Sequence, residues 1–217
     1  MKENIWEQRY KELKNLWGIE PEWTLIQYES LVKKGKILDL GIGEGRNVLK
    51  FALKNYDIEG VDISQTALKR CEQLLKNVDC NYNLHCSNLL DFTLDLNKYS
   101  LIISTWTLNF LKKSEGLKLI NNMKNILTKG GILYLGVFSK EDPKYTFLKE
   151  NNNEIEKDTF YINKRDSYIT YYNKEEILNL FNNDYEIICL KESYSLDIGH
   201  GDKHYHGDIE IMIRKSS

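Results

Sequence analysis

A glycine-rich turn offers the clearest chemistry in the sequence. Gly41, Gly43 and Gly45 alternate with other residues directly after the apolar run 36–40. Glycines in such a turn let the backbone come close to a ligand, and the N–H groups at the start of the next helix can bind it. The Gly-x-Gly-x-Gly spacing differs from the Gly-x-Gly-x-x-Gly of dinucleotide-binding folds. The turn therefore predicts a small-molecule site of another kind.

Two acidic residues stand beside this turn. Asp39 comes two residues before the first glycine, and Asp62 ends the next expected strand. A carboxylate next to the turn would repel a pyrophosphate but suits an ammonium group, and a carboxylate at the tip of the second strand can accept both hydroxyls of a ribose. Either acid alone could simply cap a turn. Both together predict a ligand such as S-adenosylmethionine (SAM).

These segments resemble the class I SAM-dependent methyltransferases over about residues 36–140. The glycine turn with Asp39 matches the first motif of that family, Asp62 matches the second, and the fourth and fifth strand regions also match. Asn88 stands where the family usually has an Asp that takes the adenine amino group, and the Asn oxygen can accept the same hydrogen bond. The resemblance implies SAM as cofactor and S-adenosylhomocysteine as product. The cofactor-binding residues that we expect are Asp39, Gly41, Gly43, Gly45, Arg46, Asn47, Asp62, Ile63, Asn88, Leu89 and Ser104.

Two shorter stretches resemble the tellurite-resistance methyltransferase group. They are Gly-Arg-Asn at 45–47 and Ser-Thr followed by Phe-Leu within 104–111. That group has a catalytic His in its last hairpin, and His200 matches this position best. Gly201 stands where the group has an Arg after the His. The resemblance therefore implies methyl transfer without implying an oxyanion substrate.

Methyl transfer from a sulfonium is an in-line displacement, which requires positioning and a dry cavity more than strong acids or bases. Ser104 and Thr105 end the fourth expected strand, at the edge where open α/β sheets bind ligands. We therefore predict that His200 orients or deprotonates the nucleophile and that Ser104 or Thr105 contacts it. The expected substrate contacts are Trp106, Tyr168, Tyr171, His204 and His206. A solvated hairpin, or a metal site formed by the histidines, is the alternative, and we expect no metal.

Apolar runs alternate with segments of helical spacing, which indicates a parallel sheet with helical crossovers. The sequence predicts an α/β fold: a Rossmann-like, seven-stranded, mostly parallel sheet with helices on both faces and a C-terminal antiparallel hairpin. The expected strands are 36–40, 57–61, 81–86, 99–104, 132–138, 185–194 and 208–214, and the expected helices are 44–54, 64–75, 114–127 and 174–181.

One domain is expected to span residues 1–217. Within it we distinguish an N-terminal helical lid at 1–35, a SAM-binding core at 36–140, and a substrate insertion with the final hairpin at 141–217. Trp6 and Tyr10 stand four residues apart, so a helix would place both on one face. That face either folds over the cofactor as a lid or packs in the core.

Charge and composition limit the classes of partner that we expect. The 30 basic and 32 acidic residues give a formal net charge of −2, without the basic excess that displaces counterions from nucleic acid. The sequence shows neither a signal peptide nor a membrane-spanning run, and its four cysteines lack paired spacing. We expect a cytoplasmic monomer or homodimer with buried thiols and no nucleic-acid or membrane partner.

The predicted function is methyl transfer from SAM to a small nucleophile: an inorganic oxyanion such as tellurite or selenite, a thiol, or a small organic acid or amine. A non-catalytic SAM-binding regulator is one alternative. A protein or RNA methyltransferase is another, although the fourth strand ends in Ser-Thr-Trp-Thr at 104–107 rather than the Asn/Asp-Pro-Pro-Tyr of adenine amino methylation. The glycine spacing disfavours a nicotinamide oxidoreductase.

Overall fold

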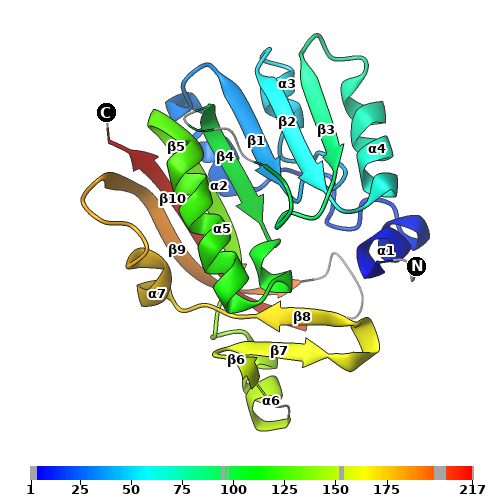
Figure 1. The fold of residues 1–217 in the computed structure, drawn as a ribbon, viewed down its shortest axis with the longest axis vertical. Coiled ribbons are helices and arrows are strands. Elements are labelled where there is room, and N and C mark those ends of the chain that lie inside the picture. The colour runs from blue at the N-terminus through cyan, green and yellow to red at the C-terminus, as the bar shows by residue number, and fades with distance from the viewer. Residues whose placement is uncertain (1–3, 94–95, 97, 152–153, 198–203, 217) are drawn as a thin grey trace.

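A seven-stranded sheet forms the centre of the computed structural model, in the strand order β3-β2-β1-β4-β5-β10-β9 (Figure 1). The structure describes residues 4–93, 96, 98–151, 154–197 and 204–216. The strands are β1 (Lys36–Leu40), β2 (Asp57–Asp62), β3 (Tyr82–Cys86), β4 (Tyr99–Thr105), β5 (Leu127–Phe138), β9 (Tyr185–Asp197) and β10 (His204–Lys215). The first five run parallel to one another, and β10 is antiparallel to both β5 and β9. This architecture confirms the predicted fold class.

Helices cover both faces of the sheet. They are α1 (Ile5–Glu12), α2 (Trp23–Gln27), α3 (Leu49–Ala52), α4 (Gln65–Leu75), α5 (Lys113–Ile126), α6 (Pro143–Asn151) and α7 (Lys174–Leu178). Because strand side chains alternate between faces, Leu38 and Leu133 pack with α5 and α7, whereas Ile37 packs with α2, α3 and α4. Two apolar cores result, and α5 crosses one face of the sheet (Figure 1).

Two boundaries differ from the sequence prediction because of glycines. The helix expected at 44–54 is the short α3, since Gly45 has a φ of +88°, which no α-helix accommodates. The strand expected from Ile132 already begins at Leu127, and Gly130, with a φ of +70°, forms an irregularity inside β5. The helix expected at 64–75 is confirmed as α4, with Ser64 as its N-cap, because the Ser64 side chain accepts from the N–H of Ala67.

The C-terminal hairpin is longer than predicted. Strands β9 and β10 pair from Asp197 opposite His204 to Tyr185 opposite Lys215. The expected strands 185–194 and 208–214 left His204 and His206 in the connection between them, which was wrong, because both belong to β10. Since β10 runs antiparallel to β5, its first residues lie at the carboxyl edge of the parallel strands. His200 lies outside the described residues.

A second, small antiparallel sheet follows α6 and was not predicted. It consists of β6 (Glu154–Glu156), β7 (Thr159–Ile162) and β8 (Ser167–Thr170). The side-chain amide of Asn109 donates to the carbonyl of Thr170, so this sheet is attached just beyond the end of β4. Aromatic residues of the insertion form a third buried cluster with Phe138.

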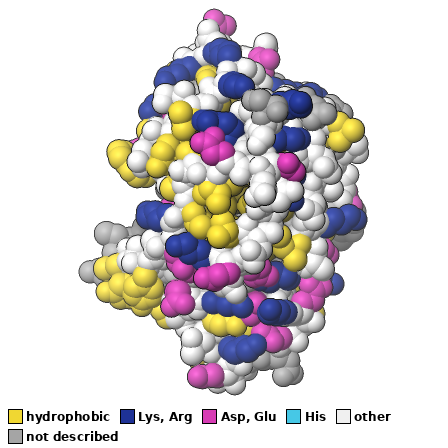
Figure 2. All heavy atoms as spheres, turned by 90° about the vertical axis from the view of Figure 1, so that its left-hand side faces the viewer, with side chains coloured by type: hydrophobic (Ala, Val, Ile, Leu, Met, Phe, Trp, Pro, Cys, Tyr) yellow, Lys and Arg dark blue, Asp and Glu magenta, His cyan; other side chains and the backbone are white. Residues whose placement is uncertain are grey.

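Acidic and basic side chains are interspersed on the face shown in Figure 2. In the described part of the chain, no helix is long and apolar enough to span a bilayer.

The buried carboxylate of Glu59 links β2 to the strands around it. It accepts from the hydroxyl of Tyr99 at 2.8 Å, lies 3.0 Å from Nε2 of His85, and pairs with the ammonium of Lys36. Burial acts to raise the pKa of Glu59, but the bonds from Lys36 and Tyr99 outweigh it and lower the pKa. The ionised carboxylate therefore stabilises the amino-terminal half of the sheet.

We predict that Glu59→Gln lowers the free energy of unfolding by about 1.5–3 kcal/mol at pH 7, the range for hydrogen bonds to charged groups. A carboxylate with a lowered pKa stabilises the fold above its unfolded pKa, near 4.3, and loses this contribution as the pH falls further. The difference between wild type and variant should thus shrink below about pH 4. Urea unfolding of wild type and variant at pH 7 and below about pH 4 measures this difference in stability. Equal stabilities at pH 7 would contradict the role of Glu59.

Candidate active site

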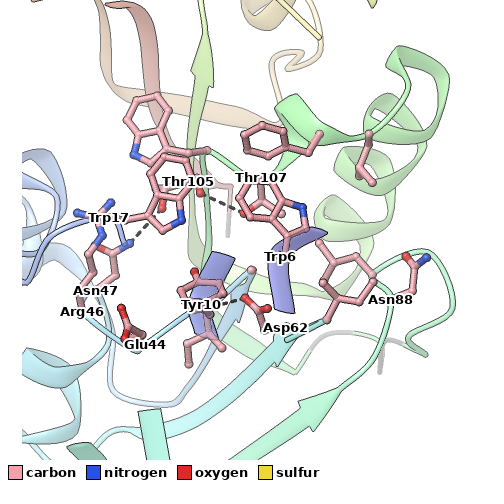
Figure 3. A pocket seen from close by; sticks show the side chains of 18 of the residues that line it. Trp6, Tyr10, Trp17, Glu44, Arg46, Asn47, Asp62, Asn88, Thr105 and Thr107 are labelled. Atoms are coloured by element: carbon pink, nitrogen blue, oxygen red, sulfur yellow. Dashed lines mark hydrogen bonds between the residues drawn. The ribbon is translucent and has the colours of Figure 1, made fainter. Parts of the chain in front are cut away.

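A cavity of about 240 Å³ opens at the carboxyl ends of β1, β2 and β4. Its wall comes from the glycine turn, from Asp62 and Ile63, from Asn88 and Leu89, from residues 105–107, and from the N-terminal residues Trp6, Tyr10 and Trp17 (Figure 3). The fold therefore gathers most of the predicted cofactor residues around one space. We refer to it as the first cavity.

The glycine turn packs too closely on its neighbours to carry side chains. Gly41 and Gly43 have φ angles of +85° and +53°. A Cβ on Gly41 would lie 2.1 Å from the hydroxyl of Thr107, and a Cβ on Gly43 would lie 2.6 Å from the hydroxyl of Tyr10. Glycine is thus required on both conformational and steric grounds.

Asp62 is fixed at the tip of β2. Its Oδ2 accepts from the N–H of Gly43 and its Oδ1 from the N–H of Ser64, both at 2.9 Å. Burial raises the pKa of Asp62, while these backbone N–H groups act to lower it. Each carboxylate oxygen retains a further lone pair, so the side chain can also accept hydroxyls from a ligand.

Asp39 is buried, and its Oδ1 has no hydrogen-bond partner among the described residues. Burial raises its pKa to about 8, with Arg46 opposing and Asp62 adding to the shift. A buried carboxyl without a partner is costly. It fits a site that is completed by the positive ammonium group of an amino-acid ligand.

Thr105 faces the first cavity with its orientation fixed by Asn47. The side-chain amide of Asn47 donates to Oγ1 of Thr105 at 3.0 Å, and the hydroxyl of Thr107 donates to the carbonyl of Thr105 at 3.1 Å. Ser104 is fully buried, and its hydroxyl has no partner within the described part of the chain. Of the two predicted catalytic hydroxyls, Thr105 is the one that lines the cavity.

The N-terminal helix is attached to the core through Glu7. Its carboxylate accepts from the hydroxyl of Ser64 at 2.7 Å and from the N–H and hydroxyl of Thr66 at 3.0 and 2.6 Å. Burial acts to raise the pKa of Glu7, but these hydrogen bonds lower it to about 2. The attachment holds Trp6 and Tyr10 against the first cavity (Figure 3).

A second cavity of about 310 Å³ adjoins the first and shares with it Trp17, Gly18, Arg46 and Trp106. The indole of Trp106 stacks on Phe138 with 6.1 Å between ring centroids. Its Nε1–H donates to the carboxylate of Glu22 at 2.7 Å, and Arg46 pairs with the same carboxylate. Trp106 thus forms part of a common wall between the two cavities.

His206 lines the second cavity beside Asp208. Its ring stacks on Phe138 at 5.7 Å, and its Nδ1 lies 3.0 Å from Oδ2 of Asp142. Asp142 is buried, and the same oxygen accepts from the N–H of Gly207. Asp142 therefore fixes the orientation of the His206 ring.

Two of the expected substrate residues lie elsewhere. Tyr171 is fully buried in the third aromatic cluster, and Tyr168 packs against Tyr161 in the small sheet. The structure describes no side chain for His204 or His200. Among the described residues, no three His, Cys, Asp or Glu side chains group around a possible metal position.

Sequence reasoning missed four residues at this edge. They are Glu7, Glu22, Asp142 and Asp208. Asp142 precedes Pro143, which is a recognisable helix start, but nothing in the local sequence indicates that its carboxylate reaches β10. The others carry no local signal because their partners lie far away in the chain.

Residues 37–131 match a family model described as a methyltransferase domain. These residues form a class I SAM-dependent methyltransferase domain. Membership of this family implies the use of SAM.

The individual relatives have low sequence identity and align with only part of this chain. A ribosomal RNA small subunit methyltransferase G of Mesomycoplasma hyopneumoniae is 33% identical over 127 residues, which are 56% of this chain and 61% of that protein. The probable SAM-dependent methyltransferase TehB of Haemophilus influenzae is 25% identical over 146 residues. This alignment covers 62% of this chain and 49% of TehB. This methyltransferase chain thus spans about half to three-fifths of these curated relatives.

Solved structures share the fold across nearly the whole chain. A SAM-dependent methyltransferase of Methanosarcina mazei superposes with a TM-score of 0.71 at 18% identity, covering 91% of this chain and 99% of that one. TehB of Haemophilus influenzae superposes with a TM-score of 0.68 at 18% identity, covering 97% and 67%. At this identity the likeness shows the fold alone.

We predict that Asp62→Ala weakens binding of S-adenosylhomocysteine by about 1.5–3 kcal/mol, because a charged hydrogen-bond acceptor is removed. Calorimetry at one site per chain measures the affinity. Glu59→Gln is the matched control, since it changes another acid of β2 and should leave the affinity within about twofold of wild type, a difference below RT ln 2 or roughly 0.4 kcal/mol. Unchanged affinity in Asp62→Ala would exclude Asp62 as a ligand-binding residue.

We predict that Glu7→Ala releases α1 from Ser64 and Thr66, with increased solvent exposure of Trp6. Because the pKa of Glu7 is lowered to about 2, wild type should keep α1 attached above pH 4.5 and lose it as the pH falls towards 2. Tryptophan emission during acid titration measures this transition, with Glu12→Ala on the same helix as control. A wild-type transition that persists in Glu7→Ala would refute the assignment.

Proposed function

We propose that this chain transfers the methyl group of SAM to a small-molecule nucleophile. The observation that carries the proposal is the second cavity, which adjoins the first through the common wall at Trp106. Its volume of about 310 Å³ lies at the lower end of the range for small-molecule sites. The first cavity is then the cofactor site and the second the acceptor site.

The residues of the first cavity suit the parts of SAM. Asp62 would accept the ribose hydroxyls, and Asn88 would accept the adenine amino group. Asp39 is buried outside the lining of this cavity, and we infer that its carboxylate offsets the charge of the ammonium group from there. SAM, when bound, supplies an electrophilic methyl group on a sulfonium sulfur. We infer that this methyl group lies towards Thr105 and Trp106, where the cavities adjoin.

The chain itself positions the reacting groups and keeps water away from them. Asn47 holds Thr105 and Glu22 holds Trp106, so the wall between donor and acceptor keeps one arrangement. Trp6 and Phe110 both line the first cavity, with 4.4 Å between their ring centroids, and we infer that these apolar rings help to exclude water. Such fixed, water-poor positioning provides most of what a methyl displacement requires. The proposed catalytic roles of His200 and Ser104 stay predictions.

RNA is the competing acceptor, because one of the relatives methylates ribosomal RNA according to its name. The balanced charge of 30 basic and 32 acidic residues supports a small acceptor instead, since RNA binding relies on neutralising phosphates. The interspersed surface charges of Figure 2 support the same choice.

We predict transfer of label from methyl-labelled SAM to at least one member of a panel of amines, thiols, small acids, selenite and tellurite. Ribosomal RNA and total protein should remain unlabelled at physiological salt. Asp62→Ala, assayed at low SAM, serves as the negative control. Labelled RNA with an unlabelled panel would contradict the proposal.

A further inference from the structure

We propose that the second cavity binds an amine with an aromatic or apolar body, with Asp208 as the partner of its ammonium form and His206, oriented by Asp142, as the acceptor of its proton. This proposal rests on the function proposed above and specifies its acceptor. It concerns the described residues of β10 and of the loop after β5.

The charges lining the second cavity favour a cation over an anion. Arg46, the one arginine of the described lining, pairs with the carboxylate of Glu22. Asp208 remains as the acidic group, and Asp142 and Glu210 lie close enough to influence it. An oxyanion in this space would face carboxylates, whereas an ammonium group would be attracted to them.

The apolar walls match the body of such a ligand. Trp17, Trp106 and Phe138 line the second cavity, and Phe138 stacks on both Trp106 and His206. Aromatic faces attract cations and bury apolar carbon. A small amine with a ring would satisfy both the walls and the carboxylate.

The pair of Asp142 and His206 has the geometry of an oriented base. Asp142 is fixed by the N–H of Gly207 at 3.2 Å and by the N–H of Lys144 at 2.8 Å. A Cβ on Gly207 would lie 2.3 Å from the backbone nitrogen of Asp142, so glycine is needed for this close approach. When Nδ1 of His206 donates to Asp142, the lone pair of the neutral ring is on Nε2. A carboxylate also stabilises the imidazolium that forms after proton uptake.

Asp208 is suited to bind a cation near neutral pH. Burial raises its pKa to about 7; His206 opposes the shift, while Asp142, Glu210 and Glu22 add to it. A bound ammonium group favours the ionised carboxylate. Binding of an amine near pH 7 should therefore release a proton from Asp208.

The ammonium group gives one proton to His206, and the nitrogen lone pair then forms the new N–C bond. The C–S bond breaks with its electron pair remaining on sulfur, which neutralises the sulfonium. The products are S-adenosylhomocysteine and the N-methylated ammonium ion, and His206 passes its proton to water.

The first test measures binding without turnover, in the full chain saturated with S-adenosylhomocysteine. Benzylamine, benzyl alcohol and benzoate share one ring and differ in charge. Benzylamine should bind at least about tenfold more tightly than the other two at pH 8, equivalent to roughly 1.4 kcal/mol. Calorimetry in buffers of different ionisation enthalpy should show proton release near pH 7. Tighter binding of benzoate would overturn the proposal.

Asp208→Asn should remove both the preference for benzylamine and the proton release. Glu186→Gln is the matched control, since it changes an exposed carboxylate of β9 that pairs with Arg214. The control should retain both properties. An unchanged preference in Asp208→Asn would overturn the role of Asp208.

The second test measures methylation of benzylamine. His206→Gln should lower kcat by about 10²–10⁴, the usual value of general-base assistance, without changing the affinity for S-adenosylhomocysteine. Asp142→Asn should lower kcat and shift the acidic limb of its pH profile, whereas a merely structural role would leave that limb in place. Full kcat and an unshifted profile in both variants would overturn the roles of His206 and Asp142.

Different results would overturn the proposed function and the amine site. Transfer of methyl groups to thiols or oxyanions but not to amines would support the proposed function and overturn this inference. Absence of S-adenosylhomocysteine binding would overturn the proposed function, while selective benzylamine binding through Asp208 would still support the amine site.

Discussion

The hydrogen bond from the Trp106 indole to Glu22 fixes the wall on which both cavities depend. Trp106 adopts a left-handed φ of +57° directly after β4, a conformation that costs of the order of 1–3 kcal/mol for a residue with a side chain. The surrounding contacts offset this cost, because the indole donates to Glu22 and stacks on Phe138. The same carboxylate binds Arg46 next to the glycine turn. One carboxylate thus connects the N-terminal segment, the cofactor turn and the acceptor wall.

Fully or partly buried acids give this edge of the sheet its chemical character. Asp39 and Asp208 have pKa values raised to about 8 and about 7, in both cases mainly by burial. Both carboxyls are therefore partly protonated at neutral pH and can ionise when a cation arrives. Asp62 is instead held by backbone N–H groups. We propose that Asp39 and Asp208 balance the ammonium groups of the cofactor and of an amine acceptor, while Asp62 accepts hydroxyl groups.

The sequence predicted those parts of the molecule that depend on local pattern. Alternating apolar runs predicted the parallel strands, and the spacing of Gly41 and Gly43 beside Asp62 predicted one shared cavity. The small sheet β6–β8 was missed because its strands have only three or four residues each and are stabilised by packing on the turn after β4. The pairing of Asp142 with His206 was missed because it joins residues 64 positions apart. The length of β10 could not be predicted either, since strand pairing rather than local propensity carries it back to His204.

The central claim is that the transferable methyl group lies at the wall shared by the two cavities. The most direct measurement is the nuclear Overhauser effect from the ¹³C-labelled methyl group of bound SAM to side-chain protons of the protein. The account predicts contacts to the indole of Trp106 and to the methyl group of Thr105, and loss of the former in Trp106→Ala. Contacts to Asn88 and Leu89 without any to Trp106 would place the methyl group at the opposite end of the first cavity and contradict the account.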